Sequence, residues 1–224
     1  MDGDMSTGLP LSVLLATTNR GKIAELSALL GDLPIELLPM SAVLPDFPPI
    51  IEDGATFEEN ALIKARAACD AAMMVTIAED AGLEVDALGG RPGVRSARFA
   101  KEGATDAENN AELLASLAEV EDDQRTARFR CVIVLRDPWN EGRPETLAEG
   151  RCEGTIARQA RGTGGFGYDP LFIVAGDGRT MAELPDAEKN KKSHRARAAM
   201  ALRKALEGLI ASRLSSMARV AGLQ

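Results

Sequence analysis

The chain has 224 residues, 45% of them hydrophobic, which is enough for one domain with a substantial core and excludes long disorder as its main state. Its formal net charge of −8 argues against binding to a nucleic acid polymer or to an anionic membrane surface. Three scattered cysteines without a CxxC pair predict buried thiols in a reducing cytoplasm, and a single histidine excludes a His-rich zinc site.

The N-terminal half predicts strands that alternate with helices. Residues 1–10 have no periodicity and are expected to form a flexible tail, so the folded domain is expected to span 11–224. The apolar run at 11–16 predicts a strand, since it is too short to cross a bilayer and lacks the basic start of a signal peptide. The pattern then predicts a helix, an extended segment, a second helix and two short strands, at residues 23–30, 35–38, 57–72, 75–78 and 83–88.

The C-terminal half predicts a mixed sheet. Residues 129–135 and 146–157 are strand-like with no helix between them, which predicts antiparallel neighbours. The other elements are expected to be a helix, a glycine-rich loop, a short strand and a final amphipathic helix, at 106–120, 162–169, 171–174 and 194–214. Strand–helix units combined with an antiparallel stretch predict an α/β fold.

The first candidate for chemistry is the polar segment between the first strand and the first helix, which contains Thr17, Thr18, Asn19, Arg20, Gly21 and Lys22. The start of a helix presents free N–H groups and a partial positive charge, so these hydroxyl, amide and ammonium groups can bind phosphate oxygens. The segment is not a Walker A loop, because the leading glycine is missing and Ile23 follows the lysine. The alternative is an ordinary turn in which Asn19 caps the helix.

The second candidate is a set of carboxylates. Glu79 and Asp80 are predicted to lie where a short strand ends, the usual place for chemistry in open α/β sheets, and Glu52 lies in an irregular segment. Magnesium prefers carboxylate oxygens together with substrate phosphates. Solvated loop carboxylates are the alternative, and for Glu59 we favour a capping box in which it reaches back to the amide of Thr56.

The third candidate is the glycine-rich loop, which holds two of the few aromatic residues of the chain, Phe166 and Tyr168. Glycines let the backbone approach a ligand, an aromatic face can stack on a base, and Asp169 can accept a hydrogen bond from a base N–H. The alternative is a glycine-rich hairpin with a half-buried aromatic residue.

The fourth candidate is a basic cluster before the last helix, for which Ser193 is expected to be the N-cap. The cluster contains Lys189, Lys191, Lys192, His194, Arg195 and Arg197. Positive charge at the start of a helix is unfavourable to the helix macrodipole, so helix stability does not explain the cluster. A bound polyanion explains it better, and a solvated basic face is the alternative. Together the four candidates supply the parts of a nucleoside triphosphate site.

Five ordered motifs resemble the inosine/xanthosine triphosphate pyrophosphatase family: TTNRGKIAEL, TFEENALIKARAA, AEDAGLEVDALGGRPGVRSARF, GTGGFGYDPLF and MAELPDAEKNKKSHRARA. The resemblance covers about residues 11–213. It implies an elongated single α/β domain with a long curved mixed β-sheet flanked by helices and two lobes with a substrate cleft between them. It also implies a cytoplasmic homodimer that uses Mg²⁺ to hydrolyse noncanonical purine nucleoside triphosphates (ITP, dITP and XTP) to the monophosphate and pyrophosphate.

The resemblance further implies a role for each matching residue. Asp80 would be the catalytic residue that binds Mg²⁺ and orients or deprotonates the attacking water, with Glu52 as a second metal ligand. The segment from Thr17 to Lys22 would hold the triphosphate, together with Lys64 and Ala81. The residues that would enclose the base and close the base and phosphate side are Phe166, Gly167, Tyr168, Asp169, Lys189, His194 and Arg195.

The chain departs from the family pattern at three positions, and two other functions stay open. Ala81 stands where the family often has a serine, Ile51 where many members have a second acid, and Arg95 where an aromatic residue is usual. One alternative is a pyrophosphatase for a standard or pyrimidine triphosphate, and the other is a catalytically silent nucleotide sensor. Donors around Arg195 match the O6 acceptor of hypoxanthine or xanthine better than the amine of adenine. This match favours hydrolysis of noncanonical purine nucleoside triphosphates over hydrolysis of a standard or pyrimidine triphosphate.

Overall fold

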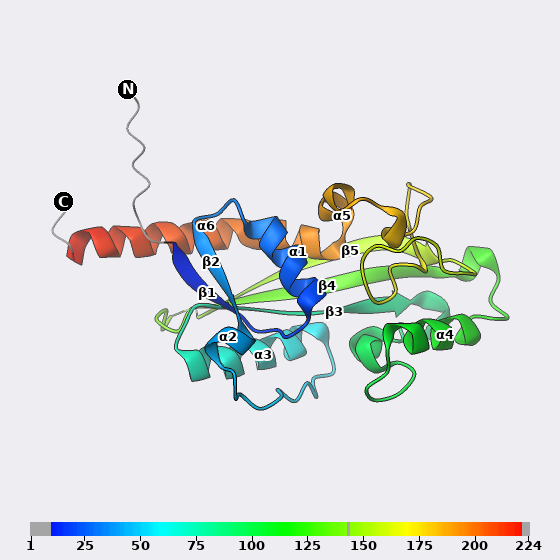
Figure 1. Cartoon of the computed structure of the whole chain (residues 1–224), viewed down its shortest axis with the longest axis horizontal. Coiled ribbons are helices and arrows are strands. Elements are labelled where there is room, and N and C mark those ends of the chain that lie inside the picture. Colours follow the sequence, from blue (N-terminus) through cyan, green and yellow to red (C-terminus); the bar gives the residue numbers. More distant parts are fainter. Residues whose placement is uncertain (1–9, 143, 221–224) are drawn as a thin grey trace, which may run out of the picture.

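The computed structural model describes residues 10–142 and 144–220, so the predicted tail, apart from Pro10, lies outside the described residues. This part contains a six-stranded sheet in the order β2-β1-β3-β4-β5-β6 (Figure 1). The strands are β1 (Leu11–Leu15), β2 (Ile35–Pro39), β3 (Thr76–Val85), β4 (Thr126–Arg136), β5 (Glu145–Ile156) and β6 (Phe172–Val174). The helices are α1 (Arg20–Leu30), α2 (Met40–Val43), α3 (Phe57–Ala72), α4 (Asp106–Ser116), α5 (Asp186–Lys192) and α6 (His194–Val220). Short 3-10 segments are η1 (Asp86–Leu88), η2 (Gly93–Arg98), η3 (Asp122–Gln124) and η4 (Met181–Glu183).

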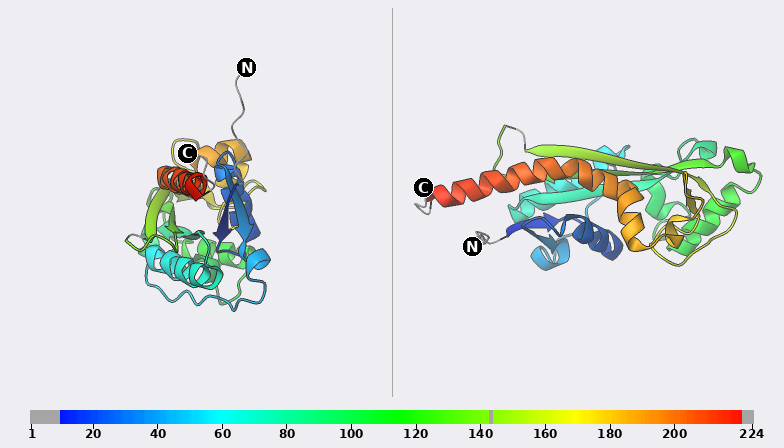
Figure 2. Two further views of the ribbon diagram at one scale, coloured as in Figure 1. Left: turned by 90° about the vertical axis from the view of Figure 1, so that its left-hand side faces the viewer. Right: turned by 90° about the horizontal axis from the view of Figure 1, so that it is seen from above.

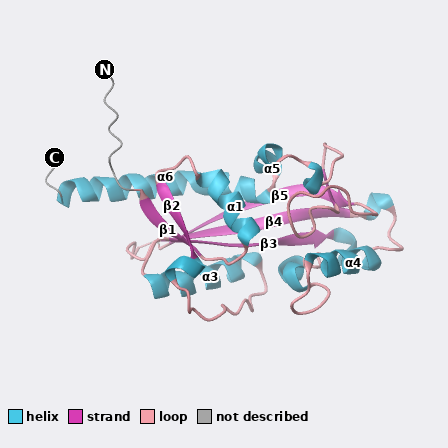
Figure 3. Ribbon diagram, viewed as in Figure 1, coloured by secondary structure: helices cyan, strands magenta, loops and turns pink. Residues whose placement is uncertain are grey.

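The sheet is mixed, as predicted. β1 is parallel to both of its neighbours, β2 and β3, whereas β3, β4, β5 and β6 pair antiparallel. Parallel strands need a crossover, which α1 supplies between β1 and β2. The long strands β3, β4 and β5 run along most of the elongated molecule (Figure 3). The predicted α/β fold with a long curved mixed sheet is therefore confirmed.

One long strand, β3, replaces the two short strands predicted at 75–78 and 83–88. Glu79 and Asp80 lie in its middle, and the prediction that they mark a strand end is wrong. Both carboxylates are bonded by cationic side chains, Glu79 by Lys22 and Asp80 by Lys64. Because the charges are paired, these polar residues do not interrupt the ladder with β4.

Other boundaries differ from the predictions by a few residues. α1 begins three residues early, at Arg20, where Asn19 provides its cap. α4 ends at Ser116 rather than at 120, and α6 continues past 214 to Val220. α5 was not predicted, because its lysine-rich sequence has no apolar period.

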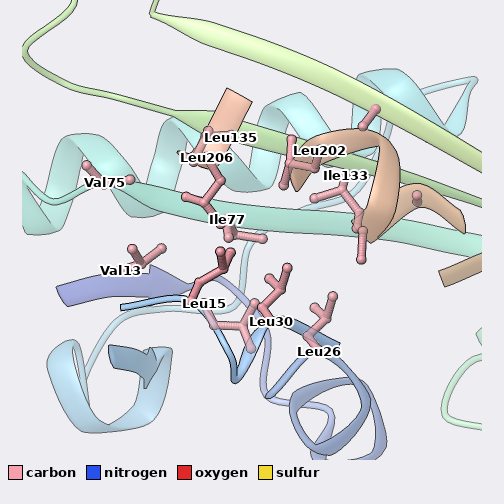
Figure 4. Packing of buried hydrophobic residues seen from close by; sticks show 14 of the residues in the cluster. Val13, Leu15, Leu26, Leu30, Val75, Ile77, Ile133, Leu135, Leu202 and Leu206 are labelled. Carbon is pink, nitrogen blue, oxygen red and sulfur yellow. The ribbon is translucent and has the colours of Figure 1, made fainter. Parts of the chain in front are cut away.

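The sheet curls around α6, which lies with α1 on its concave side (Figures 1 and 2). On this side α6 buries four apolar residues, Ala199, Leu202, Leu206 and Ile210. Leu209, on the same apolar face, is only partly buried. Figure 4 shows Leu202 and Leu206 facing Ile77, Ile133 and Leu135 of the sheet. Gly150 of β5 permits the close approach of α6, since a Cβ there would lie 2.1 Å from the carbonyl oxygen of His194.

The opposite side of the sheet is covered by α3 and, farther along, by α4 (Figure 1). α3 presents a stripe of alanines, including Ala61, Ala65 and Ala68, that are fully buried against the sheet. α4 contributes Leu113 to a separate core at the other end of the molecule. The cores around α1, α6 and α3 form one lobe, and the core around α4 forms the other. The glycine-rich loop belongs to the lobe of α4, through Tyr168. Among the described residues, no helix is long and apolar enough to cross a membrane.

Candidate active site

A cleft of about 560 Å³ lies between the lobes. It is lined by the β1–α1 turn, the irregular segment before α3, the middle of β3, η2, the glycine-rich loop and the start of α6. The cleft brings together the predicted site residues Thr17, Thr18, Asn19, Lys22, Glu52, Lys64, Asp80, Ala81, Phe166, Gly167, Tyr168, Asp169, Lys189, His194 and Arg195. The other two predicted residues, Arg20 and Gly21, are not part of its lining.

The turn between β1 and α1 forms one end of the cleft. The side-chain oxygen of Asn19 accepts hydrogen bonds from the backbone N–H groups of Gly21 and Lys22, at 2.9 and 3.1 Å, so Asn19 is the N-cap of α1. The cap that was the alternative reading is therefore present, and the same residue also lines the cleft. Thr17 supports the turn by accepting from the N–H of Asn19 at 3.2 Å.

Gly21 has a packing function at this end. A Cβ on Gly21 would lie 2.6 Å from Cδ1 of Phe166, which is closer than real side chains come. The absence of a side chain therefore allows the ring of Phe166, from the other lobe, to lie against the first turn of α1.

The middle of the cleft holds two carboxylates that converge on one ammonium group. Lys64 Nζ lies 2.9 Å from Asp80 Oδ1 and also donates to Glu52, while the amide of Asn60 donates to Asp80 Oδ2 at 3.2 Å. Burial raises the pKa of Asp80, and the positive charges of Lys64 and Lys22 oppose this shift. Burial lowers the pKa of Lys64, but the carboxylates of Asp80 and Glu52 outweigh it, so the net shift is upward.

The segment that carries Glu52 is held by two neighbouring elements. Arg98 of η2 donates to the backbone carbonyl of Glu52 at 3.2 Å. At the start of α3, Thr56 accepts from the N–H of Glu59 at 3.1 Å, as expected for a cap. The carboxylate of Glu59 accepts from the N–H of Ala55 at 2.6 Å and not from that of Thr56, so the predicted capping box is only half formed.

Another wall of the cleft is built on the glycine-rich loop. The ring of Phe166 has the ammonium of Lys189 at 5.3 Å and the guanidinium of Arg195 at 5.5 Å from its centroid. Tyr168 is buried, and its hydroxyl donates to the carbonyl of Ser96 at 2.8 Å. Asp169 accepts from the N–H of Phe166 at 3.0 Å and pairs with Lys189 at 2.6 Å, which fixes the turn of the loop.

Two glutamates connect the cations of the site: Glu79, which the sequence indicates as a candidate carboxylate, and Glu25, which it does not. Glu79 accepts two hydrogen bonds from the guanidinium of Arg195, at 2.7 and 2.8 Å, and pairs with Lys22 at 3.1 Å. Glu25 pairs with Lys189 at 2.6 Å and also with Arg195. Burial raises the pKa of Glu79, but Arg195 and Lys22 outweigh it and hold this pKa well below its usual range. For Glu25 a signal existed, since it lies one turn after Lys22 on the same helix.

The basic cluster divides into buried and exposed parts. Ser193 caps α6 by accepting from the N–H of Ala196 at 3.1 Å, as predicted. His194 is buried and stacks on Phe129 with 4.7 Å between ring centroids, and its Nδ1 has no hydrogen-bond partner within the described part of the chain. Burial, reinforced by Arg195, lowers the pKa of His194 well below 6.5. Lys192 pairs with Asp177, outside the cleft lining.

The three departures from the family pattern differ in position. Ala81 lines the cleft and follows Asp80 directly on β3. Ile51 is 78% exposed, and Arg95 is exposed and 3.4 Å from Glu102, so neither contributes its side chain to the cleft. Only Ala81 therefore bears directly on the site.

A family model described as the Ham1 family matches residues 13–205. The chain belongs to the Ham1 family. A dITP/XTP pyrophosphatase of Geobacter sulfurreducens is 51% identical over 186 residues, covering 83% of this chain and 92% of the relative. A dITP/XTP pyrophosphatase of Shigella flexneri is 46% identical over 194 residues, covering 87% of this chain and 97% of the relative.

Solved structures of Ham1 proteins have the same fold. A HAM1 protein from Coxiella burnetii superposes with a TM-score of 0.79 at 43% identity, covering 88% of this chain and 99% of that chain. A nucleoside-triphosphatase, or dITP/XTP pyrophosphatase, from Mycobacterium abscessus gives a TM-score of 0.68 at 44% identity, covering 86% and 97%. The family resemblance drawn from the five motifs is thus confirmed.

Proposed function

We propose that this Ham1 protein hydrolyses noncanonical purine nucleoside triphosphates (ITP, dITP and XTP) to the monophosphate and pyrophosphate with Mg²⁺, and so cleanses the nucleotide pool. The observation that carries the proposal is the set of groups that line one cleft. A helix start with Lys22, the carboxylates around Lys64, and an aromatic loop flanked by Lys189 and Arg195 all contribute to its walls. This set matches the needs of a triphosphate, its metal and its base.

The enzyme class rests on the relatives. Curated relatives that are 46–51% identical over most of the chain carry the name dITP/XTP pyrophosphatase, which confirms the prediction of a nucleoside triphosphate pyrophosphatase. The substrates, the metal, the homodimer and the cytoplasmic location are our proposals. Buried free thiols at all three cysteines support a reducing compartment.

The carboxylates of the cleft fit a magnesium ion. Glu52 and Asp80 both contact Lys64 Nζ, so the two carboxylates lie close together in the cleft. No group of three or more potential ligands occurs among the described residues, and Mg²⁺ typically takes one or two carboxylates and completes its shell with substrate phosphates and water. When bound, the ion would neutralise phosphate charge and lower the pKa of a bound water.

The chain's own residues supply positioning and proton transfer. Asp80 would orient the attacking water and accept its proton. Lys64 and Lys22 would offset the negative charge of the leaving pyrophosphate. The cap at Asn19 fixes the first turn of α1, and the positive end of the dipole of this helix would favour phosphates bound beside it.

Base selection would follow from the donors beside Phe166. Glu79 and Glu25 together accept from three nitrogens of Arg195, which fixes the plane of its guanidinium beside Phe166. Fixed donors match the O6 acceptor of hypoxanthine or xanthine. The exocyclic amine of adenine would face donors with another donor, at a cost of about 1–3 kcal/mol.

The test is pyrophosphate release from ITP, dITP, XTP, ATP, GTP and dTTP, each with Mg²⁺ and with EDTA. Release from the first three that needs the metal, with little from the others, is the expected result. Release from all substrates or from dTTP would retain the chemistry and contradict the base selectivity. Binding of ITP without release would indicate a nucleotide sensor, and Ala81→Ser would then test whether the missing hydroxyl is responsible.

A further inference from the structure

Helix α4 grips the backbone of the glycine-rich loop at Gly167. Asp106 Oδ2 accepts a hydrogen bond from the N–H of Gly167 at 2.7 Å, and the side-chain amide of Asn110 donates to its carbonyl oxygen at 3.0 Å. Asp106 and Asn110 are four residues apart, so they lie on the same face of α4. Two side chains of one helix thus hold both polar backbone groups of a single residue.

The residue that α4 grips lies between the two aromatic residues of the loop. Gly167 has a φ of +62°, a conformation that glycine adopts without strain, and it follows Phe166 directly. Rotation of its peptide groups would move the ring of Phe166 away from Lys189 and Arg195. The grip therefore determines where the aromatic face of the cleft is located.

α4 is itself fixed to the cleft wall. A complete capping box between Thr105 and Glu108 forms its first turn. The amide of Asn109 donates to the carbonyl of Ala97 at 3.2 Å and accepts from the N–H of Ala100 at 3.0 Å, which ties α4 to η2 and the residues after it. The helix is therefore a firm support from which to hold the loop.

The amide of Asn110 is not explained by local stability. Its Oδ1 is buried and has no hydrogen-bond partner among the described residues, while its Nδ2 donates to Gly167. Leaving a buried acceptor unpaired is unfavourable, and a small apolar side chain would avoid it. The interaction that accounts for an asparagine at this position is its hydrogen bond to the carbonyl oxygen of Gly167.

We propose that Asp106, which also lines the cleft, and Asn110, which does not, are positioning residues for base recognition, acting through Gly167 on Phe166. This inference rests on the proposed function, because it takes Phe166 as the residue that contacts the base. It predicts that loss of the grip weakens binding of the base and leaves binding of the phosphates intact.

The experiment measures equilibrium binding of two ligands by calorimetry: IMP, which carries the base, and imidodiphosphate, which occupies only the phosphate end. The variants are Asp106→Asn, which replaces the charged acceptor, and Asn110→Ala, which removes the donor. Glu112→Gln is the matched control, because this exposed α4 carboxylate accepts from Ser116 of its own helix and from no other residue that the structure describes. We expect about tenfold weaker IMP binding in the two variants, the factor for one hydrogen bond, and imidodiphosphate binding within about twofold of the unaltered chain.

Three outcomes would overturn the inference. Unchanged IMP binding in both variants would show that the grip does not position Phe166. Equal weakening of IMP and imidodiphosphate would indicate a general disturbance of the cleft, and lack of IMP binding by the unaltered chain would remove base recognition altogether. Because none of these measurements needs turnover, the pyrophosphate-release panel tests the proposed function separately.

Discussion

Neighbouring residues of a strand face opposite sides of the sheet, and on β3 this alternation gives two carboxylates different surroundings. Asp80 faces the cleft beside Lys64, whereas Glu79 is buried with Arg195 and Lys22. That Asp80 belongs to a site could be expected from the sequence, because two adjacent acids after an apolar run are conspicuous, and the structure places Asp80 in the cleft. The partner of Glu79 could not, since Arg195 is 116 residues away along the chain.

Replacing Asp80 with asparagine tests the catalytic assignment. Asparagine keeps the shape but can neither accept a proton efficiently nor supply a charged metal ligand, so we expect the rate of pyrophosphate release to fall by about 100-fold or more. The folded structure should persist, as measured by circular dichroism and urea unfolding. Asp70→Asn is the control, because Asp70 pairs with Arg136 at the surface, outside the cleft lining. Near-normal activity of the Asp80 variant would remove this residue from the mechanism.

Replacing Glu79 with glutamine tests the buried ion pairs. The change leaves Arg195 and Lys22 without their fully buried counter-charge, so the free energy of unfolding should fall by about 3–5 kcal/mol. The control is Glu153→Gln on β5, which removes an exposed partner of Arg128 and should cost at most about 1 kcal/mol. Urea unfolding measures both.

The unaltered chain and the Glu79→Gln variant also allow a test of the pH dependence of stability. The folded pKa of Glu79 is lowered, so its contribution to stability is complete above its ordinary pKa of 4.5 and is lost as the pH falls below that value. The stability difference between the unaltered chain and the Glu79→Gln variant should therefore be constant from neutral pH down to about 4.5 and shrink at lower pH. A difference that does not change with pH would contradict the assigned charge of Glu79.

At the scale of elements, regular apolar patterns predicted the fold well. The apolar periodicity at residues 57–72 and 194–214 predicted both α3 and α6, because the residues that pack against the sheet recur with the helical period. Local patterns did not predict the continuous β3, because its ladder with β4 and its distant cations compensate for the acids in its middle. They also did not reveal the contact between Gly21 and Phe166, which depends on how the lobes meet.

That contact can be tested with Gly21→Ala. The new Cβ would displace the ring of Phe166, so we expect KM for ITP to rise by roughly an order of magnitude, as small misplacements of positioning groups do. Gly208→Ala on α6 is the control, since a Cβ there meets open space and should stabilise the helix by about 0.5–1 kcal/mol without affecting kinetics. An unchanged KM in the Gly21 variant would mean that Phe166 has room to move, and that its position against α1 is not needed.

At the scale of the whole molecule, one chain of ion pairs joins the lobes. It runs from Lys22 through Glu79, Arg195, Glu25 and Lys189 to Asp169, and so from the first helix to the glycine-rich loop. The sequence revealed all three cations of these ion pairs as candidates, because they lie in short motifs. It did not reveal that they neutralise buried acids, so their number overstated the positive charge offered to a ligand.

The single histidine, His194, makes the free energy of unfolding depend on pH in the neutral range, and this dependence can be assigned to one residue. His194 is buried among Arg195, Lys189 and Lys22, with Glu79 as the compensating acid, and its folded pKa is well below 6.5. Below pH 6.5 His194 is therefore protonated in the unfolded chain and neutral in the folded chain. The free energy of unfolding must decrease as the pH falls through this range. Linkage predicts a loss of about 1.4 kcal/mol from this group between roughly pH 7.5 and 5.5.

The comparison of urea unfolding in the unaltered chain and a His194→Gln variant isolates this loss, because the other titrating groups are common to both. The unaltered chain should lose about 1.4 kcal/mol more than the variant over that pH range. In the folded protein the imidazole resonance should not titrate in the same range, which NMR can follow without ambiguity since the chain has one histidine. A resonance that titrates near 6.5 would show that the imidazole is accessible to protons, and parallel stability curves would show that its burial carries no electrostatic cost.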